Sequence, residues 1–188
     1  MDPALAIFVL LLLATAVMRS IELGVSIRRL SARRGALVPE PRLFPAMVLL
    51  HTGLIVLPLA EVWLGHRPFI GWIGGPAAAI LVAATALRIW TLATIGEAWN
   101  VRVVRPTEQT VVTTGPYRFI RHPNYLCVIL EIAALPLLHS AWISALLLSA
   151  LNAAVLAVRI PTEEATLARL PAWREAMSGR ARLIPGLF

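Results

Sequence analysis

Two groups of polar residues have the types and spacing that chemistry needs, and the first is the stretch Gly115-Pro-Tyr-Arg-Phe-Ile-Arg-His-Pro-Asn-Tyr125. Gly115-Pro116 predicts a turn, because glycine adopts positive φ and proline fixes its own φ. Pro123 suits the first position of a helix and disfavours helical backbone at His122. The stretch is therefore expected to open a helix, whose unpaired N–H groups and dipole would favour an anionic group.

The second group is Arg159 and Glu163, which are four residues apart. On one helical turn their side chains would face the same way. Arg159 could then hold an anionic substrate, and Glu163 a cationic group of a cofactor. From the residues alone, the two groups predict a site at a membrane face for an amphipathic substrate, and a solvated rim of charges is the alternative.

Other kinds of site are absent from the sequence. There is no G-x-G-x-x-G or G-x-x-x-x-G-K-[ST] loop, no H-E-x-x-H motif and no G-x-S-x-G nucleophile motif. The one cysteine, Cys127, gives neither an internal disulfide nor a Cys-based zinc site, and we expect no metal. All basic residues are arginines beside apolar runs, with a net charge of +7, which favours lipid headgroups over nucleic acid as a partner.

The elements that must position these residues are membrane helices. The 188 residues are 59% hydrophobic, which is more than a soluble domain of this size normally carries. We expect an all-α integral membrane protein that forms one domain over residues 1–188, with five spans at about 4–23, 43–64, 70–95, 124–138 and 141–160. A signal peptide is the alternative for the first run, but Asp2 and the lack of an early basic residue argue against it.

The positive-inside rule gives the expected orientation. The loop 24–42 carries Arg28, Arg29, Arg33, Arg34 and Arg42, so it is expected in the cytoplasm and the N-terminus outside. The segment 96–124 and the tail 161–188, which has a C-terminal helix, are then cytosolic as well. Pro161 predicts a new helix or a kink, and Gly74, Gly75 and Pro76 are expected to delay the regular third helix until about Ala77.

Several charged or polar residues fall inside the predicted spans. Arg19 and Glu22 have the spacing of a helical ion pair. His51 is expected to be a hydrogen-bonded structural residue, because no second histidine lies at helical spacing. Arg88 could reach the cytosolic surface or pair with a carboxylate inside the bundle. Glu131 could be functional, or it could be the buried partner of an arginine such as Arg88 or Arg159.

Beyond these inferences, the order G-P-Y-R-x-x-R-H-P-N-Y, an apolar helical hairpin and R-x-x-x-E-E resembles the isoprenylcysteine carboxyl methyltransferase family, over roughly Trp99 to Pro185. The resemblance implies S-adenosylmethionine as methyl donor, bound at the cytosolic membrane face without a Rossmann domain. Carried over by position, it implies that Arg159 is catalytic through substrate orientation. It implies cofactor contacts at Gln109, Thr110, Val111, Val112, Tyr117, His122, Pro123, Asn124, Tyr125 and Glu163.

The segments N-V-R-V-V and L-E-I-A-A-L-P-L are similar to those of the family branch that methylates alkylpyrones and alkylresorcinols. We therefore expect an O-methyltransferase of a bacterial inner membrane, acting on a lipophilic or lipidated carboxylate, phenol or enol that enters from the bilayer. An NADPH-dependent sterol or steroid reductase is one alternative, because such proteins share a similar R-H-P-N-Y segment. A lipid-binding or assembly protein without enzymatic activity is the other.

Overall fold

The computed structural model describes residues 2–32, 43–103 and 111–186. Within these ranges the regular structure is helical: α1 (Pro3–Ala32), α2 (Leu43–Leu64), α3 (Gly71–Ile95), the 3₁₀ turns η1 (Gly96–Ala98) and η3 (Gly115–Arg118), α4 (Pro123–Leu137), α5 (Trp142–Leu167) and α6 (Pro171–Met177). Apart from an isolated bridge between Ile120 and Ala181, these parts of the chain contain no strand. The expected all-α class is confirmed.

Four helices, α1, α2, α3 and α5, are long and apolar enough to cross a membrane. The remaining predicted span corresponds to α4, which has 15 residues. At 1.5 Å per residue it is roughly 22 Å long, which is shorter than the hydrocarbon core of a typical bilayer. Large apolar side chains such as Leu10, Leu49 and Val82 are exposed on the outside of the bundle, as expected for lipid contact.

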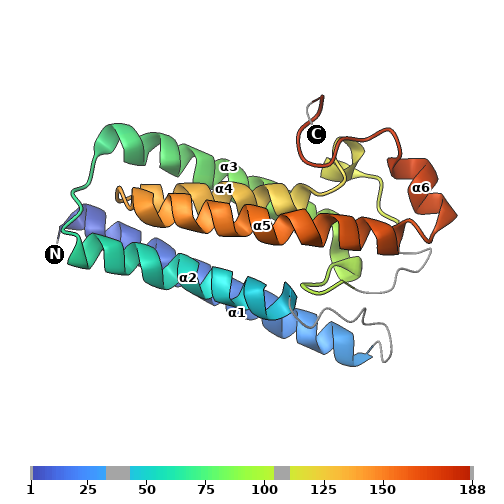
Figure 1. The fold of residues 1–188 in the computed structure, drawn as a ribbon, viewed down its shortest axis with the longest axis horizontal. Helices are drawn as coiled ribbons and strands as arrows, with labels where there is room; N and C mark the ends of the chain where they lie inside the picture. Colours follow the sequence, from blue (N-terminus) through green and yellow to red (C-terminus); the bar gives the residue numbers. More distant parts are fainter. Residues whose placement is uncertain (1, 33–42, 104–110, 187–188) are drawn as a thin grey trace.

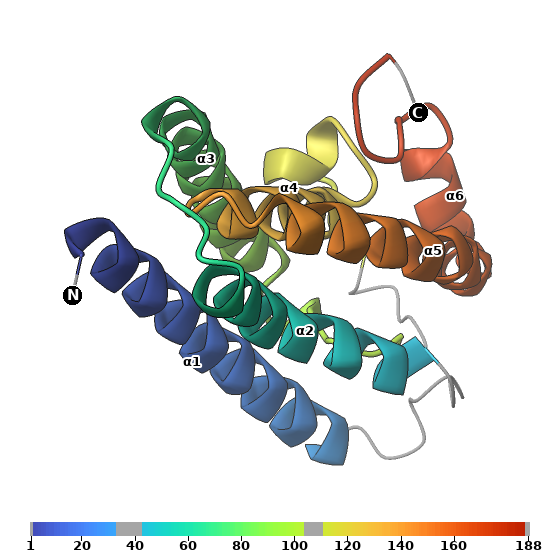
Figure 2. The same cartoon turned by 60° about the vertical axis from the view of Figure 1, so that its left-hand side comes forward.

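The helices pack in two groups (Figures 1 and 2). α4 lies between α3 and α5, and the pair α1–α2 meets them through the contact of α2 with α5. The core between the two groups contains Phe8, Leu12, Leu54, Ile132 and Leu135, all nearly inaccessible to solvent. The end of α5, η1, η3 and α6 gather at one end of the bundle, which brings segments far apart in sequence together.

Three helix boundaries differ from the prediction. α1 continues to Ala32, so the first part of the expected loop 24–42 is helical. α3 is regular from Gly71 rather than Ala77. Gly74 serves close packing, since a Cβ there would lie 2.7 Å from a ring carbon of Phe69 and 3.0 Å from the Leu138 carbonyl oxygen. α5 continues through Pro161 to Leu167, so no new helix begins there. Polar contacts of α5 residues on both sides of Pro161, described below, hold this last part of the helix in place.

Candidate active site at one end of the bundle

A cavity of about 520 Å³ lies at the end of the bundle where the polar segments gather. Tyr117, from η3, and residues at the start of α4 line one side. Arg159 and Glu163 of α5 line another, with Trp173 of α6 beside them. A further part of the cavity is lined by residues of α1 and α2, where apolar side chains such as Val48 and Ile55 outnumber polar ones such as Glu22. The cavity therefore joins a polar end to an apolar branch, a shape suited to an amphipathic molecule.

At the polar end, the Tyr125 hydroxyl group lies between the two predicted charged residues. Arg159 Nε donates a hydrogen bond to Tyr125 Oη over 2.7 Å, and the hydroxyl group donates to Glu163 Oε2. The Arg159 guanidinium carbon is 5.7 Å from the centre of the Tyr125 ring. Since α5 is helical from Trp142 to Leu167, Arg159 and Glu163 lie one turn apart on one face, the relative position that their spacing predicts.

Arg159 is buried, and its other nitrogens contact α2 and the segment after η1. Nη2 donates to the Val101 carbonyl oxygen over 2.5 Å, and Nη1 lies 2.9 Å from Met47 Sδ. These contacts fix the guanidinium group at the boundary between the polar end of the cavity and its apolar branch. Met47 was not expected at the site, because a methionine in a predicted span carries no sequence signal that separates a site residue from a lipid-facing one.

Glu164 has a different role from its neighbour Glu163. Its carboxylate accepts hydrogen bonds from Arg182 Nη2 at 2.9 Å and Arg121 Nη1 at 3.3 Å, and it lies 3.2 Å from His122 Nε2. The bond to Glu164 raises the pKa of Arg182. Backbone bonds from Arg121 N to Ala181 O and from His122 N to Arg182 O join the tail to the same segment. Glu164 therefore ties the C-terminal tail to the start of α4.

The remaining predicted cofactor contacts have different positions. Gln109 and Thr110 lie outside the described residues. Val111 and Val112 pack against the cluster of Tyr117, Trp173 and Met177, and Val112 also lines the cavity. Pro123 begins α4 and is buried, while His122 is its N-cap and lines the cavity.

Asn124 lines the cavity with a buried Oδ1 that accepts no hydrogen bond from the residues described. Trp99 resembles it, since its buried Nε1 has no partner within the same ranges. An unpaired buried polar atom beside a cavity indicates room for a ligand or water that would satisfy it. Trp99 was not among the predicted site residues. It reaches the cavity because the fold brings the end of η1 there, and no local sequence pattern shows that placement.

Tyr117 is the buried aromatic residue of the predicted turn. Burial raises the pKa of its phenol above the ordinary value, and the Glu163 carboxylate raises it further. The phenol is therefore a neutral group near Glu163. Gly115, which opens the turn, has a φ of +56°, and a Cβ there would lie 2.4 Å from Thr94 Oγ1. The predicted turn with positive φ is therefore present, and glycine also allows it to approach α3 closely.

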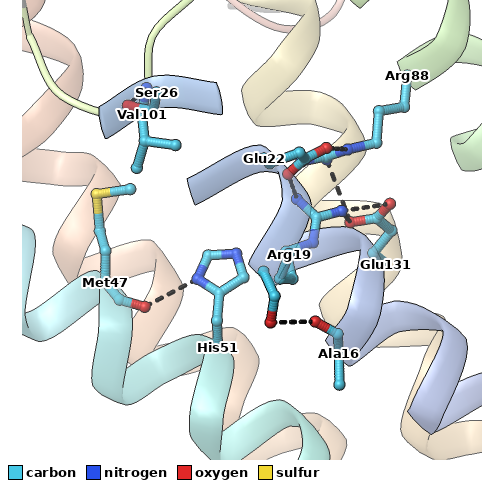
Figure 3. Close-up of polar contacts among 10 residues, drawn as sticks. Ala16, Arg19, Glu22, Ser26, Met47, His51, Arg88, Val101 and Glu131 are labelled. Carbon is cyan, nitrogen blue, oxygen red and sulfur yellow. Dashed lines mark hydrogen bonds and ion pairs between the residues drawn. The ribbon is translucent and has the colours of Figure 1, made fainter. Parts of the chain in front are cut away.

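The charged residues inside the helices form one network between α1, α3 and α4 (Figure 3). Arg88 pairs with Glu22 at 2.8 Å and with Glu131 at 3.3 Å. Arg19 pairs with the same two carboxylates, at 2.8 Å and 3.0 Å. Because Arg88 is only 3% exposed, it does not reach the surface, and the pairing alternative is the one found. Two positive and two negative groups thus compensate each other and link the two helix groups.

The fold has four candidate membrane helices and a cavity at one end, and the comparisons with known proteins give its family. Residues 77–169 match the model of the isoprenylcysteine carboxyl methyltransferase (ICMT) family. The uncharacterized protein YpbQ of Bacillus subtilis is 34% identical over 136 residues, which are 72% of this chain and 80% of YpbQ. The chain belongs to the ICMT family, so it is an integral membrane protein of a methyltransferase family.

Two more distant relatives share shorter regions. An uncharacterized protein of Haemophilus influenzae is 32% identical over 93 residues, which are 49% of this chain and 54% of the relative. The cobalt-zinc-cadmium resistance protein CzcN of Cupriavidus metallidurans is 32% identical over 83 residues, which are 44% of this chain and 37% of CzcN. The chain thus spans about half or less of these two proteins.

Proposed function

We propose that the protein is an S-adenosylmethionine-dependent O-methyltransferase that acts on a lipophilic carboxylate, phenol or enol at the membrane. The observation that carries the proposal is the arrangement of Arg159 and Glu163 around the Tyr125 hydroxyl group at the wall of the cavity. ICMT family methyltransferases use S-adenosylmethionine as methyl donor, which favours the same cofactor here. The segments N-V-R-V-V and L-E-I-A-A-L-P-L favour an alkylpyrone or alkylresorcinol as the methyl acceptor.

The residues at the polar end fit the chemistry of this cofactor. The amino and sulfonium groups of S-adenosylmethionine are cationic, so the Glu163 carboxylate is a suitable partner for one of them. The buried Asn124 Oδ1 could accept a hydrogen bond from a further donor. The faces of Tyr117 and Tyr125 attract cations and could pack on a base. The start of α4 at His122 and Pro123 offers backbone N–H groups to a carboxylate.

When bound, the cofactor supplies an activated methyl group for an in-line displacement. The protein then contributes mainly position and exclusion of water. Arg159 would orient the acceptor oxygen, because it is fixed between Tyr125, Met47 and Val101 at the junction with the apolar branch. The tail of a lipidic acceptor would lie in that branch between α1 and α2, where it reaches the site from the bilayer.

We also propose a membrane topology. The chain crosses a bacterial inner membrane five times, counting α4, with the N-terminus outside and the site facing the cytoplasm. The end of α1, which carries Arg28 and Arg29, lies at the same end of the bundle as η1, η3 and the start of α4, and the chain carries Arg102, Arg118 and Arg121 in or next to these elements. The positive-inside rule places such an end in the cytoplasm. Reporter fusions in the two loops at the opposite end would test this orientation.

The cofactor is tested by thermal unfolding of the detergent-solubilised protein. S-adenosylhomocysteine is expected to raise the unfolding temperature, because a ligand that binds the folded state stabilises it. NADPH should have no effect, and the reverse pattern would favour a reductase. Transfer of labelled methyl groups from S-adenosylmethionine into a lipid extract of the native host then identifies the acceptor. Absence of label from every lipid and protein fraction would contradict the proposal.

A further inference from the structure

His51, in the middle of α2, lines the same cavity as Arg159 and Glu163. Its Nδ1 lies 2.8 Å from the Met47 carbonyl oxygen (Figure 3). A carbonyl oxygen can only accept, so this bond assigns the ring proton to Nδ1 and leaves the lone pair of the neutral ring on Nε2. The sequence-based expectation of a hydrogen-bonded histidine is therefore confirmed for one nitrogen, and the other remains available to a ligand.

Met47 connects this imidazole to the candidate active site. Its carbonyl oxygen holds His51, while its Sδ lies 2.9 Å from Arg159 Nη1. His51 is one helical turn further along α2 than Met47, which is about 6 Å along the helix axis. An acceptor oxygen bound at Arg159 would therefore have the His51 ring on the side of the apolar branch, where the rest of the acceptor must lie.

Three other candidate bases that line the cavity, Glu22, Glu163 and His122, each have a partner on at least one atom. Glu22 is paired with Arg19 and Arg88, in the network that also holds Glu131. Glu163 accepts the Tyr125 hydroxyl group. His122 Nε2 lies beside the Glu164 carboxylate. His51 Nε2 has no hydrogen-bond partner among the described residues, and Met47 ties this imidazole to Arg159.

We propose that His51 Nε2 is the proton acceptor for a hydroxyl group of the methyl acceptor, an inference that rests on the proposed methyltransferase function. In the step, the hydroxyl oxygen forms a bond to the methyl carbon, and the carbon–sulfur bond breaks with its electron pair moving to sulfur. The hydroxyl proton moves to His51 Nε2. The products are a methyl ether, S-adenosylhomocysteine and a protonated imidazole, which releases its proton to solvent through the cavity.

This role narrows the substrate class to phenols and enols. A carboxylic acid is already ionised at neutral pH and needs no base, whereas a phenol with a pKa of about 10 stays protonated without one. Arg159 would stabilise the oxygen as its proton leaves, since the guanidinium group is always charged. A base and a fixed cation on two sides of one oxygen are what a weakly acidic hydroxyl group requires.

The test compares three acceptors that carry the same long alkyl chain, in lipid nanodiscs with labelled S-adenosylmethionine. They are an alkylphenol, a nitro-substituted alkylphenol that is ionised at neutral pH, and a fatty acid. The wild-type protein is expected to methylate the two phenols. His51→Phe and His51→Gln should lower kcat for the alkylphenol by roughly 10²–10⁴-fold, and for the ionised nitrophenol far less. His66→Asn, in the exposed turn after α2, is the matched control with full activity.

The outcomes separate this inference from the proposed function. Equal losses on both phenols would mean that His51 has a structural role, and loss of stabilisation by S-adenosylhomocysteine in both His51 variants would mean the same. A wild-type protein that binds S-adenosylhomocysteine but methylates only the fatty acid, or neither phenol, would overturn the hydroxyl assignment. If S-adenosylhomocysteine does not stabilise the wild type at all, the proposed function fails first.

Discussion

Arg88 of α3 holds Glu22 of α1 by two parallel hydrogen bonds, from Nε to Oε1 at 2.8 Å and from Nη2 to Oε2 at 2.9 Å. This planar, two-point contact joins helices that otherwise belong to different groups of the bundle. Both side chains are buried between the helices, so their charges have little alternative solvation. The relationship explains how α1, which packs mainly on α2, is held against the α3–α4 side.

The first prediction concerns this pair. Arg88→Leu is expected to destabilise the folded protein by about 3–5 kcal/mol, because it leaves buried carboxylates with only Arg19 as counterion. Chemical unfolding in detergent micelles measures the change. The double variant Arg88→Leu with Glu22→Gln should recover part of the loss, since it removes one of the uncompensated charges. A double variant that is additive within about 0.5 kcal/mol would contradict the coupling.

The second prediction contrasts two neighbouring carboxylates. Glu163→Gln should abolish stabilisation by S-adenosylhomocysteine while the unfolding temperature of the unliganded protein changes little. Glu164→Gln should lower that temperature, because Glu164 holds Arg121 and Arg182, but it should keep a response to the ligand. Each variant is the control of the other, as the substitutions are identical and adjacent. An unchanged ligand response in Glu163→Gln would refute its assigned role.

A third prediction concerns the hydroxyl group between Arg159 and Glu163. Tyr125→Phe keeps the ring beside His122, at a centroid distance of 5.3 Å, but removes hydrogen bonds to both charged groups. Hydrogen bonds to charged groups are worth about 1.5–3 kcal/mol, so kcat/KM should fall roughly 10–150-fold. Steady-state methyl transfer measures the effect. Wild-type kinetics in this variant would show that the hydroxyl group does not position the two residues.

The fourth prediction uses the alkaline titration of the protein, which has no lysine and only two tyrosines. The pKa of Tyr117 is raised in the folded state, so the folded protein keeps a proton that the unfolded chain loses above about pH 10. Stability should therefore fall as pH rises above that value. In Tyr117→Phe this fall should be smaller. The check is unfolding at several alkaline pH values, together with the absorbance of tyrosinate, and an equal fall in both proteins would contradict it.

Local signals were sufficient for much of the fold and part of the candidate site. Apolar runs gave the long helices, and Gly115-Pro116 and Pro123 gave the turn and the helix start that the structure contains. The four-residue spacing of Arg159 and Glu163 gave their common face. These features depend on residues close in sequence, and sequence patterns report on such residues directly.

Other features depend on tertiary contacts that no local pattern contains. The sequence left Arg88 and Arg159 as possible partners of Glu131. In the structure Glu131 pairs with Arg88 and also with Arg19, which is 112 residues from Glu131 in the sequence. Beyond Pro161, α5 contacts Tyr125 of α4, Arg182 of the tail and the cluster that contains Tyr117. Glu163 and Glu164 look equivalent in sequence, but adjacent helix positions point about 100° apart, so they have separate partners.

The bonds of Arg121 and His122 to Ala181 and Arg182 have a consequence for biosynthesis. The residues around 181 are translated after every membrane helix of the bundle, so the wall formed by the start of α4 stays unsupported while those helices insert. Cofactor affinity should consequently arise in one late step of synthesis. Ribosome-stalled chains that expose α5 but not residues 178–182 would be membrane-integrated and still unable to bind the ligand.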